Sequence, residues 1–293
     1  MTAFSRIGVI TKPQDPRVTA TLAHLLTYLR ERGLTILPDE SFQALARTPP
    51  LTDQVYSRAE IARESDLVVV VGGDGTLLHA ARSLADHGVP VVGVNVGRLG
   101  FLVDVSPEHL HTQLDAIFAG DYQEERRTLL CGTVMRGAAT LAEHTALNDI
   151  VLHVRDVVRM IDFETRIDGR FVHSQRADGY VVSTPTGSTA YALSCGGPLL
   201  HPGLDAFALV PIASHTLSNR PIVVTGDSEI EIILLAHSQS SAQIAFDGQS
   251  NIDIEPEDRV VIRKAPAPLR LIHPIDYDYY AILRRKLRWS EQP

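Results

Sequence analysis

The chain has 293 residues, 44% of them hydrophobic and 21% charged, a composition typical of a soluble globular protein. Its net charge of −8 disfavours nonspecific nucleic-acid binding, and its two cysteines are too few for a disulfide framework. No apolar run is long enough to span a bilayer, and residues 1–6 carry no cleavable signal pattern. We therefore expect a cytoplasmic protein with no nucleic acid and no membrane among its partners.

The first part of the chain, residues 1–125, alternates strand and helix patterns. Ile7–Ile10 is typical of a short apolar strand, and the helical spacing that follows it ends at Gly33. Two further apolar strands, at 66–71 and 91–95, are again followed by helical patterns. Repeated strand-helix units predict a parallel sheet with helices on its faces, which is a Rossmann-like α/β domain.

The pattern changes after Arg127 to short, often alternating strands broken by turns. Asp168-Gly169 lies between two of them, and this dipeptide favours a tight type I′ hairpin, in which both central residues need positive φ. We expect residues 126–269 to form an all-β, sandwich-like domain. The tail, residues 270–293, contains Leu271–His273 and returns to helical spacing, and we expect it to join the first domain.

The strongest chemical signal is the turn Gly72–Thr76, with the sequence Gly-Gly-Asp-Gly-Thr, which follows a valine strand and opens a helical pattern. Glycines let the backbone approach an anion, and a helix start directs N–H groups and a positive dipole end toward it. A carboxylate at Asp74 is costly beside phosphates unless it accepts a proton, holds a hydroxyl or helps hold a cation. The turn therefore predicts phosphoryl transfer or hydroxyl recognition. The alternative is that Asp74 only caps the helix.

A second dense segment, Ser183–Pro198, follows a strand and mixes hydroxyls, glycines and one tyrosine. Hydroxyls and glycine amides offer donors to phosphates and sugars, and Tyr191 offers a flat face or a phenol to a base or ribose. We expect this segment to contact a nucleotide. The alternative is an ordinary Ser/Thr-rich loop.

The motifs occur in the order seen in one enzyme family. Gly72–Thr76, Asn148-Asp149, Thr184–Ser194 and Asp247-Gly248-Gln249 together resemble the motifs of bacterial NAD kinases over most of the chain. The glycine turn alone would also fit lipid kinases of the diacylglycerol kinase type, and it resembles the phosphofructokinase motif. The Thr-Pro-Thr-Gly-Ser-Thr-Ala-Tyr stretch is similar to the NAD kinase version and separates these families.

The resemblance implies that ATP phosphorylates the 2′-hydroxyl of the adenosine ribose of NAD, giving NADP, in a crevice between an α/β domain and a β-sandwich-like domain. It implies that Asp74 accepts the hydroxyl proton and that Gly75 gives close backbone approach. The other residues expected to contact the dinucleotide are His79, Asn148, Asp149, Arg159, Arg176, Asp178, Thr186, Thr189, Ala190, Tyr191, Ala192, Leu193, Ser194 and Gln249.

Several of these residues also have structural interpretations that involve no ligand. Asn148-Asp149 also suits an Asx turn before a strand, and a lone histidine such as His79 often packs against a neighbour. Arg159 and Arg176 could be solvated surface residues. A turn is enough to explain the Asp247-Gly248 dipeptide, so Gln249 need not contact a ligand.

The expected cofactor is Mg²⁺, or another divalent cation, bound with ATP, because magnesium binds largely through phosphate oxygens and waters and leaves little trace in a sequence. The family is usually oligomeric, which implies a homo-oligomer. Two rival functions stay open. One is a lipid or sugar kinase with the same glycine turn, and the other is a noncatalytic dinucleotide sensor, which would gain little from the carboxylate of Asp74.

Overall fold

The computed structural model describes residues 4–12, 16–45, 54–97, 100–155, 160–216, 218–238 and 240–289. The chain divides into two compact units. Unit 1 runs to Arg126 and includes the residues from Leu269 onward, and unit 2 is Arg127–Pro268. Within the described ranges, no helix is both long enough and apolar enough to cross a membrane.

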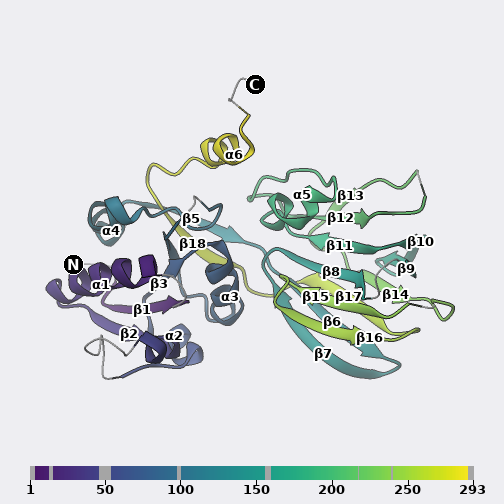
Figure 1. Cartoon of the computed structure of the whole chain (residues 1–293), viewed down its shortest axis with the longest axis horizontal. Helices are drawn as coiled ribbons and strands as arrows, with labels where there is room; N and C mark the ends of the chain where they lie inside the picture. The colour runs from purple at the N-terminus through teal and green to yellow at the C-terminus, as the bar shows by residue number, and fades with distance from the viewer. Residues whose placement is uncertain are drawn as a thin grey trace. The chain divides into compact units, whose positions relative to one another are not determined.

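Unit 1 is built on a six-stranded sheet (Figure 1). Parallel pairing joins the first five strands of the sheet order, so the sheet is mostly parallel. In sheet order the strands are β2 (Thr35–Pro38), β1 (Arg6–Thr11), β3 (Leu67–Gly72), β4 (Val91–Asn95), β18 (Leu269–Pro274) and β5 (Tyr122–Arg127). Strand β3 is buried along its whole length, as a strand covered by helices on both faces should be.

Helices pack on this sheet, and a helix-ending glycine in the sequence marks the end of one of them. The helices are α1 (Pro16–Glu31), α2 (Arg58–Glu64), α3 (Asp74–Leu84), α4 (Leu110–Ala119) and α6 (Tyr279–Leu287), with 3-10 turns η1 (Glu40–Leu45), η2 (Ala85–His87) and η3 (Pro107–His109). Leu22, Leu25 and Leu29 of α1 share a buried cluster with alternate valines of β3, Val69 and Val71. Gly120 ends α4 with φ of 97°.

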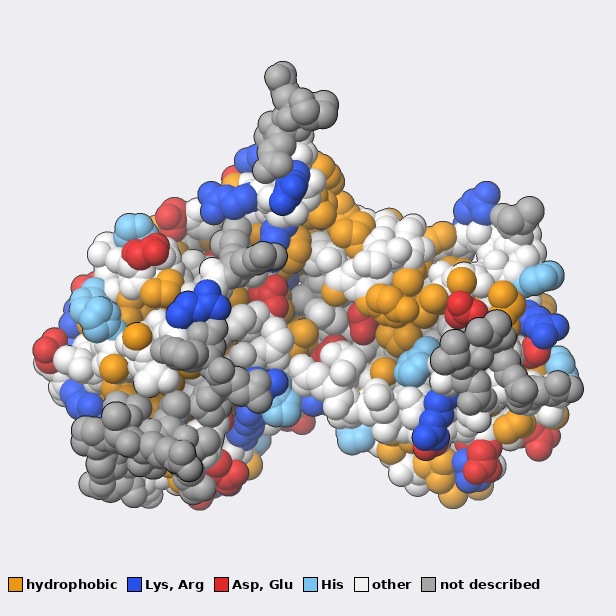
Figure 2. All heavy atoms as spheres, viewed as in Figure 1, with side chains coloured by type: hydrophobic (Ala, Val, Ile, Leu, Met, Phe, Trp, Pro, Cys, Tyr) orange, Lys and Arg blue, Asp and Glu red, His pale blue; other side chains and the backbone are white. Residues whose placement is uncertain are grey.

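The end of unit 1 differs from the sequence prediction at one point. Leu271–His273 were grouped with the helical tail, but they lie in β18, which pairs in parallel with β4. A short apolar run before a proline has no periodicity that separates a strand from a helix, so the error was in the type of element. The exposed basic residues of α6 form a solvated face, and Figure 2 shows Lys and Arg side chains gathered over this helix.

Unit 2 consists of two six-stranded antiparallel sheets, which confirms the predicted all-β class. The first sheet contains β10 (Arg170–Ala177), β9 (Ile161–Ile167), β14 (Ile230–Leu234), β17 (Arg259–Lys264), β6 (Leu130–Arg136) and β7 (Ala139–Ala146). The second contains β13 (Ile222–Thr225), β12 (Ala206–Ile212), β11 (Gly179–Ser183), β8 (Asp149–Val154), β15 (Ala242–Phe246) and β16 (Ser250–Ile254).

The two sheets pack face to face around one apolar cluster. Phe163 of the first sheet and Tyr180 of the second are fully or almost fully buried, with ring centroids 5.3 Å apart. The predicted hairpin at Asp168-Gly169 is confirmed, since both residues have positive φ between the antiparallel strands β9 and β10.

The second sheet also has a partly covered outer face. Strand β8 sends Ile150 and Leu152 into the sandwich core, so the alternating residues Val151 and His153 point to the other side. There, Val151 packs with Ala192 of the short helix α5 (Tyr191–Ser194), which follows the 3-10 turn η4 (Gly187–Thr189). This outer face carries the candidate site of unit 2.

Candidate active site

The glycine turn joins β3 to α3 in unit 1. Gly73 is the N-cap residue and Asp74 is the first residue of the helix. The carboxylate of Asp74 accepts hydrogen bonds from the backbone N–H groups of Phe101 (2.8 Å) and Leu102 (3.0 Å), so each oxygen has one amide donor. Asp74 is therefore not merely the cap of its own helix, because its carboxylate is bound to a segment that lies 27 residues further along the chain.

This arrangement leaves no room for a side chain at Gly100. A Cβ built there would lie 2.0 Å from Oδ1 of Asp74 and 2.7 Å from the Val103 side chain. The segment after Gly100 can therefore approach the carboxylate closely enough for its amides to bond only because residue 100 is glycine. The two amides fix the direction of the Asp74 carboxylate and leave each oxygen able to accept a further hydrogen bond.

Two glycines of the turn face open space. A Cβ at Gly73 or Gly75 would meet nothing within 4 Å, so a ligand can approach the backbone at both residues. Gly75 and His79 are exposed on α3, and the His79 carbonyl accepts a hydrogen bond from Arg58. The turn therefore combines an oriented carboxylate with an accessible helix start, where anions are favoured.

In unit 2, the hydroxyl-rich segment uses much of its own hydrogen-bonding capacity. The Thr184 hydroxyl donates to the Leu147 carbonyl (2.6 Å), and the Ser188 hydroxyl donates to the Pro185 carbonyl (2.6 Å). Thr186 is buried, and its hydroxyl accepts from Arg127 at 3.4 Å. These hydroxyls shape the loop, so its sequence overstates the number of donors that a ligand could use.

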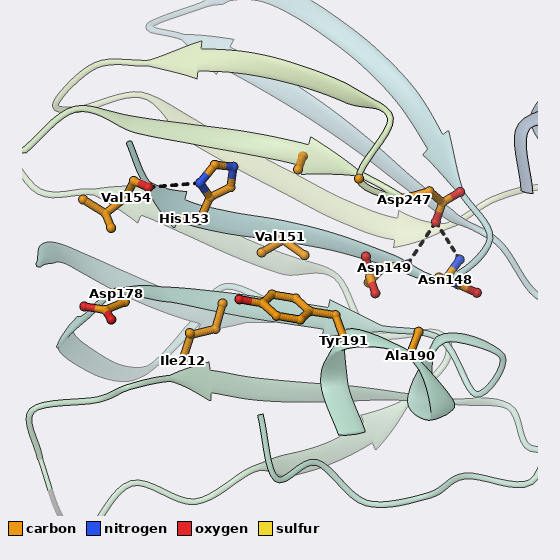
Figure 3. A pocket seen from close by; sticks show the side chains of 12 residues that line it. Asn148, Asp149, Val151, His153, Val154, Asp178, Ala190, Tyr191, Ile212 and Asp247 are labelled. Atoms are coloured by element: carbon orange, nitrogen blue, oxygen red, sulfur yellow. Dashed lines mark hydrogen bonds between the residues drawn. The ribbon is translucent and has the colours of Figure 1, made fainter. Parts of the chain in front are cut away.

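A cavity of about 560 Å³ lies beside this loop on the outer face of the second sheet (Figure 3). Figure 3 shows Asn148, Asp149 and Asp247 at one end and His153 and Asp178 at the other. The ring of Tyr191 lies between the two ends. The lining residues are Asn148, Asp149, Val151, His153, Val154, Asp178, Ala190, Tyr191, Ile212, Ala245, Asp247 and Gly248.

Asp247 shapes the end of the cavity that also contains Asn148 and Asp149 (Figure 3). Asp247 has a φ of 51°, and its carboxylate accepts from the backbone N–H groups of Leu147 (2.9 Å), Asn148 (2.7 Å) and Asp149 (3.2 Å). Burial, and after it the charge of Asp247, raises the pKa of the Asp149 carboxyl to about 7. Asp149 can therefore be a hydrogen-bond donor or acceptor near neutral pH.

The tyrosine of the cavity is half exposed and stays protonated. Tyr191 is 45% exposed, and burial of its phenol raises its pKa, with Cys195 adding to the effect. The ring supplies a flat apolar face, while the three carboxyl groups and His153 supply polar contacts. The lining residues that the structure describes include neither Lys nor Arg, so the cavity suits hydroxyl and amine groups better than phosphates.

The structure brings some of the predicted contact residues together and places others elsewhere in unit 2. Asn148, Asp149, Asp178, Ala190 and Tyr191 line the cavity. The predicted residues that do not line it are Arg176 (exposed on β10), Thr186 and Ala192 (buried), Thr189 and Leu193 (half-buried), and Ser194 and Gln249 (exposed). Arg159 lies outside the described residues.

Sequence reasoning missed several lining residues, among them Val151, His153, Ile212 and Ala245. Strand alternation could have found Val151 and His153, because residues between the core positions of β8 must point outward. Asp247 was assigned to a turn within a family motif and not to the contact residues, and its bonds to three distant amides leave no local signal in the sequence.

Comparisons with known proteins cover both units. Residues 7–122 match the ATP-NAD kinase N-terminal domain, and residues 147–274 match the ATP-NAD kinase C-terminal domain. The chain is 49% identical to the NAD kinase of Nitrosococcus oceani over 289 residues, covering 99% of this chain and 98% of the relative. It is also 49% identical to the NAD kinase of Methylococcus capsulatus over 289 residues, covering 99% of each chain.

Two solved structures are similar in fold. An NAD kinase from Archaeoglobus fulgidus in complex with ATP has a TM-score of 0.75 and 28% identity, covering 97% of this chain and 98% of that one. Yeast NADH kinase complexed with NADH has a TM-score of 0.87 at 23% identity, covering 100% of this chain and 92% of that one.

Proposed function

Because the chain belongs to the NAD kinase family, we propose that it transfers the γ-phosphate of ATP to the 2′-hydroxyl of the adenosine ribose of NAD, giving NADP. The observation that carries the chemical part of the proposal is the Asp74 carboxylate, held by two backbone amides beside an open helix start. A sensor would have no need for this arrangement.

Asp74 acts on the reacting hydroxyl. Its carboxylate accepts the hydrogen bond of the ribose 2′-hydroxyl and so orients the oxygen toward the γ-phosphate. Because the transition state of phosphoryl transfer is loose in most accounts, the proton moves to Asp74 late, and orientation contributes more than basicity. The amides of Phe101 and Leu102 hold the Asp74 side chain in one direction, so its orientation is set before the hydroxyl arrives.

The cavity of unit 2 binds a nucleoside part of NAD. Tyr191 packs its ring on a base or ribose, while Asn148 and Asp149 pair with hydroxyl or amine groups. Its three carboxyl groups make the cavity a poor place for the pyrophosphate. The remaining predicted contacts with the dinucleotide, including Arg159, Arg176 and Gln249, stay part of this proposal.

A divalent cation, Mg²⁺ by preference, accompanies ATP. Its ligands would come largely from phosphate oxygens and water, and it would neutralise charge that develops on the phosphates. Among the residues that the structure describes, no three His, Cys, Asp or Glu side chains gather as a metal site. With excess chelator, turnover should be lost while NAD binding measured by calorimetry is kept.

The enzyme acts in the cytoplasm, where both substrates occur, and it acts as a homo-oligomer. Support for self-association comes from edge strand β10, on which Phe171 is 61% exposed and Val172 is 38% exposed. Light scattering on the purified protein tests this directly, and a monomeric mass would contradict it.

The function is tested by incubating the purified protein with ATP, Mg²⁺ and NAD and identifying the product. We expect a product that co-migrates with NADP and whose phosphate is assigned to the 2′ position by NMR. Turnover of diacylglycerol or a sugar phosphate with NAD inert would establish the rival kinase. Binding of NAD without transfer from ATP would establish the sensor.

A further inference from the structure

The segment that fixes Asp74, residues 100–105, is itself held by the C-terminal strand of unit 1. Two residues beyond Leu102, the Asp104 carboxylate meets the imidazole of His273 in β18, with Oδ2 and Nδ1 2.8 Å apart. We infer that His273, acting through Asp104 and the backbone of residues 101–104, is a positioning residue for Asp74. The inference rests on the role proposed for Asp74 in the transfer.

His273 is held in one orientation by its surroundings. The side chain is 0% exposed, and Nε2 lies 3.3 Å from Oε2 of Glu125 in β5. The ring stacks on Tyr277, with centroids 3.8 Å apart and an interplanar angle of 15°. Carboxylates at both edges and a ring on one face leave the imidazole little freedom, so Nδ1 is a fixed anchor for Asp104.

Asp104 depends on this anchor. Its side chain is only 10% exposed, and Oδ1 has no hydrogen-bond partner among the residues that the structure describes. A buried carboxylate that loses its partner is strongly disfavoured. Without the imidazole, Asp104 would turn toward water and would move the backbone that carries the Phe101 and Leu102 amides.

The segment has little space in which to absorb such a movement. A Cβ at Gly93 of β4 would lie 2.9 Å from the Cα of Val103, and the Val105 N–H donates to the Gly93 carbonyl at 3.1 Å. At the other end, Gly100 already packs against the Asp74 carboxylate. Because packed groups of this kind transmit displacement rather than absorb it, a shift at Asp104 reaches Asp74.

The test compares two replacements of His273. The amide nitrogen of Asn reaches the place of Nδ1 and can still donate to Asp104, whereas that of Gln reaches the place of Nε2 and faces Glu125. We expect His273→Gln to lower kcat by about 10- to 100-fold, as a small misplacement of a reacting group does, with KM for NAD nearly unchanged. His273→Asn should keep more of the turnover.

Arg270→Gln is the matched control. Arg270 joins β18 to β5 through Glu124 at 2.7 Å, so its loss breaks a contact between the same two strands without touching Asp104. We expect a kcat near that of the unmodified protein. An equal loss of kcat in Arg270→Gln, or a rise in KM that accompanies the fall in kcat, would overturn the inference.

A double variant separates positioning from a structural role. In the Asp74→Asn background, His273→Gln should lower kcat no further, because the carboxylate that it positions is gone, and an additive loss would overturn the inference. If Asp74→Asn alone keeps full turnover, the proposed role of Asp74 fails. If only His273→Gln keeps full turnover, the positioning role alone fails.

Folding is checked by circular dichroism and thermal unfolding. Should His273→Gln fail to fold, Asp104→Ser removes the same contact together with the buried charge. Asp104→Ser should then show the same split, with kcat lowered and KM for NAD kept, and a normal kcat in this variant would overturn the inference.

Discussion

The glycine turn of unit 1 and the hydroxyl segment of unit 2 look similar in sequence, since both follow a buried strand and are rich in glycine and polar residues. The structure uses them differently. The turn leaves the backbone open at Gly73 and Gly75, and the carboxylate of its Asp74 is held by backbone amides of a distant segment. The hydroxyl segment bonds to itself and to its neighbours through Thr184 and Ser188. A polar residue in a motif can therefore shape a site without touching the ligand.

This difference predicts that the two segments affect different kinetic quantities. Changes at the turn should act mainly on kcat, because the role proposed for Asp74 is to orient the reacting hydroxyl. Changes around the hydroxyl segment should act mainly on the affinity for NAD, because that segment builds the wall of the cavity. Substitutions in unit 2 test this division between kcat and affinity.

The largest effect in unit 2 is expected from Gly187→Ala. A Cβ at this position would lie 2.1 Å from the backbone carbonyl oxygen of Asn148, so Asn148 and the cavity must shift. We expect a lower melting temperature, with a cost of about 1–3 kcal/mol, and NAD binding weakened by about 10- to 100-fold, measured by scanning and titration calorimetry.

The matched control is Gly203→Ala in the same unit. Its Cβ would meet only the His201 ring at 3.3 Å, and this side chain can move. Gly203→Ala should bind NAD normally. NAD binding that is unchanged in Gly187→Ala would mean that the loop does not support the nucleoside site.

Tyr191→Ala should have the next largest effect. Loss of the ring removes the flat face of the cavity and should raise KM for NAD by about 10-fold, with kcat at saturation nearly kept. Tyr191→Phe keeps the ring and should retain most of the affinity. Steady-state kinetics on both variants decide the matter, and a normal KM in Tyr191→Ala would remove the tyrosine from the site.

The smallest effect concerns the stability of unit 2 as a function of pH. The pKa of Asp149 is raised from 3.8 to about 7, so the native state holds the proton more tightly than the unfolded chain does. Its stabilising contribution is fully present below about pH 4 and is lost as the pH rises through about 7. Asp149→Asn cannot ionise, so its melting temperature relative to the unmodified protein should rise by about 3 °C between about pH 6 and about pH 8.

Thermal unfolding across this pH range checks the prediction for Asp149. Asp253→Asn, which removes an exposed carboxylate from the same unit, is the control and should show no such trend. A constant difference between Asp149→Asn and the unmodified protein would show that Asp149 does not titrate in this range.

The fold was largely predictable from the sequence, because buried valine strands and helical spacing ending at glycines are local signals. The type of β18 was not predictable, since Leu271 and Ile272 pair with a strand that lies far away in the chain. For the same reason, the sequence predicts only part of the candidate site. Asp74 and Tyr191 stand out within their motifs, but the amides of Phe101 and Leu102 and the cavity-building role of Asp247 arise only from contacts between distant segments.

The measurement that tests the central claim most directly is the kinetics of Asp74→Asn, with NAD affinity measured by calorimetry on the same sample. Asn keeps the shape of the side chain and one acceptor oxygen but cannot take the hydroxyl proton, and its NH2 group cannot accept the hydrogen bond of the second backbone amide. We expect kcat to fall by about 100- to 10,000-fold while the affinity for NAD stays nearly unchanged. Full turnover in this variant, or an equal loss of turnover and affinity, would contradict the account.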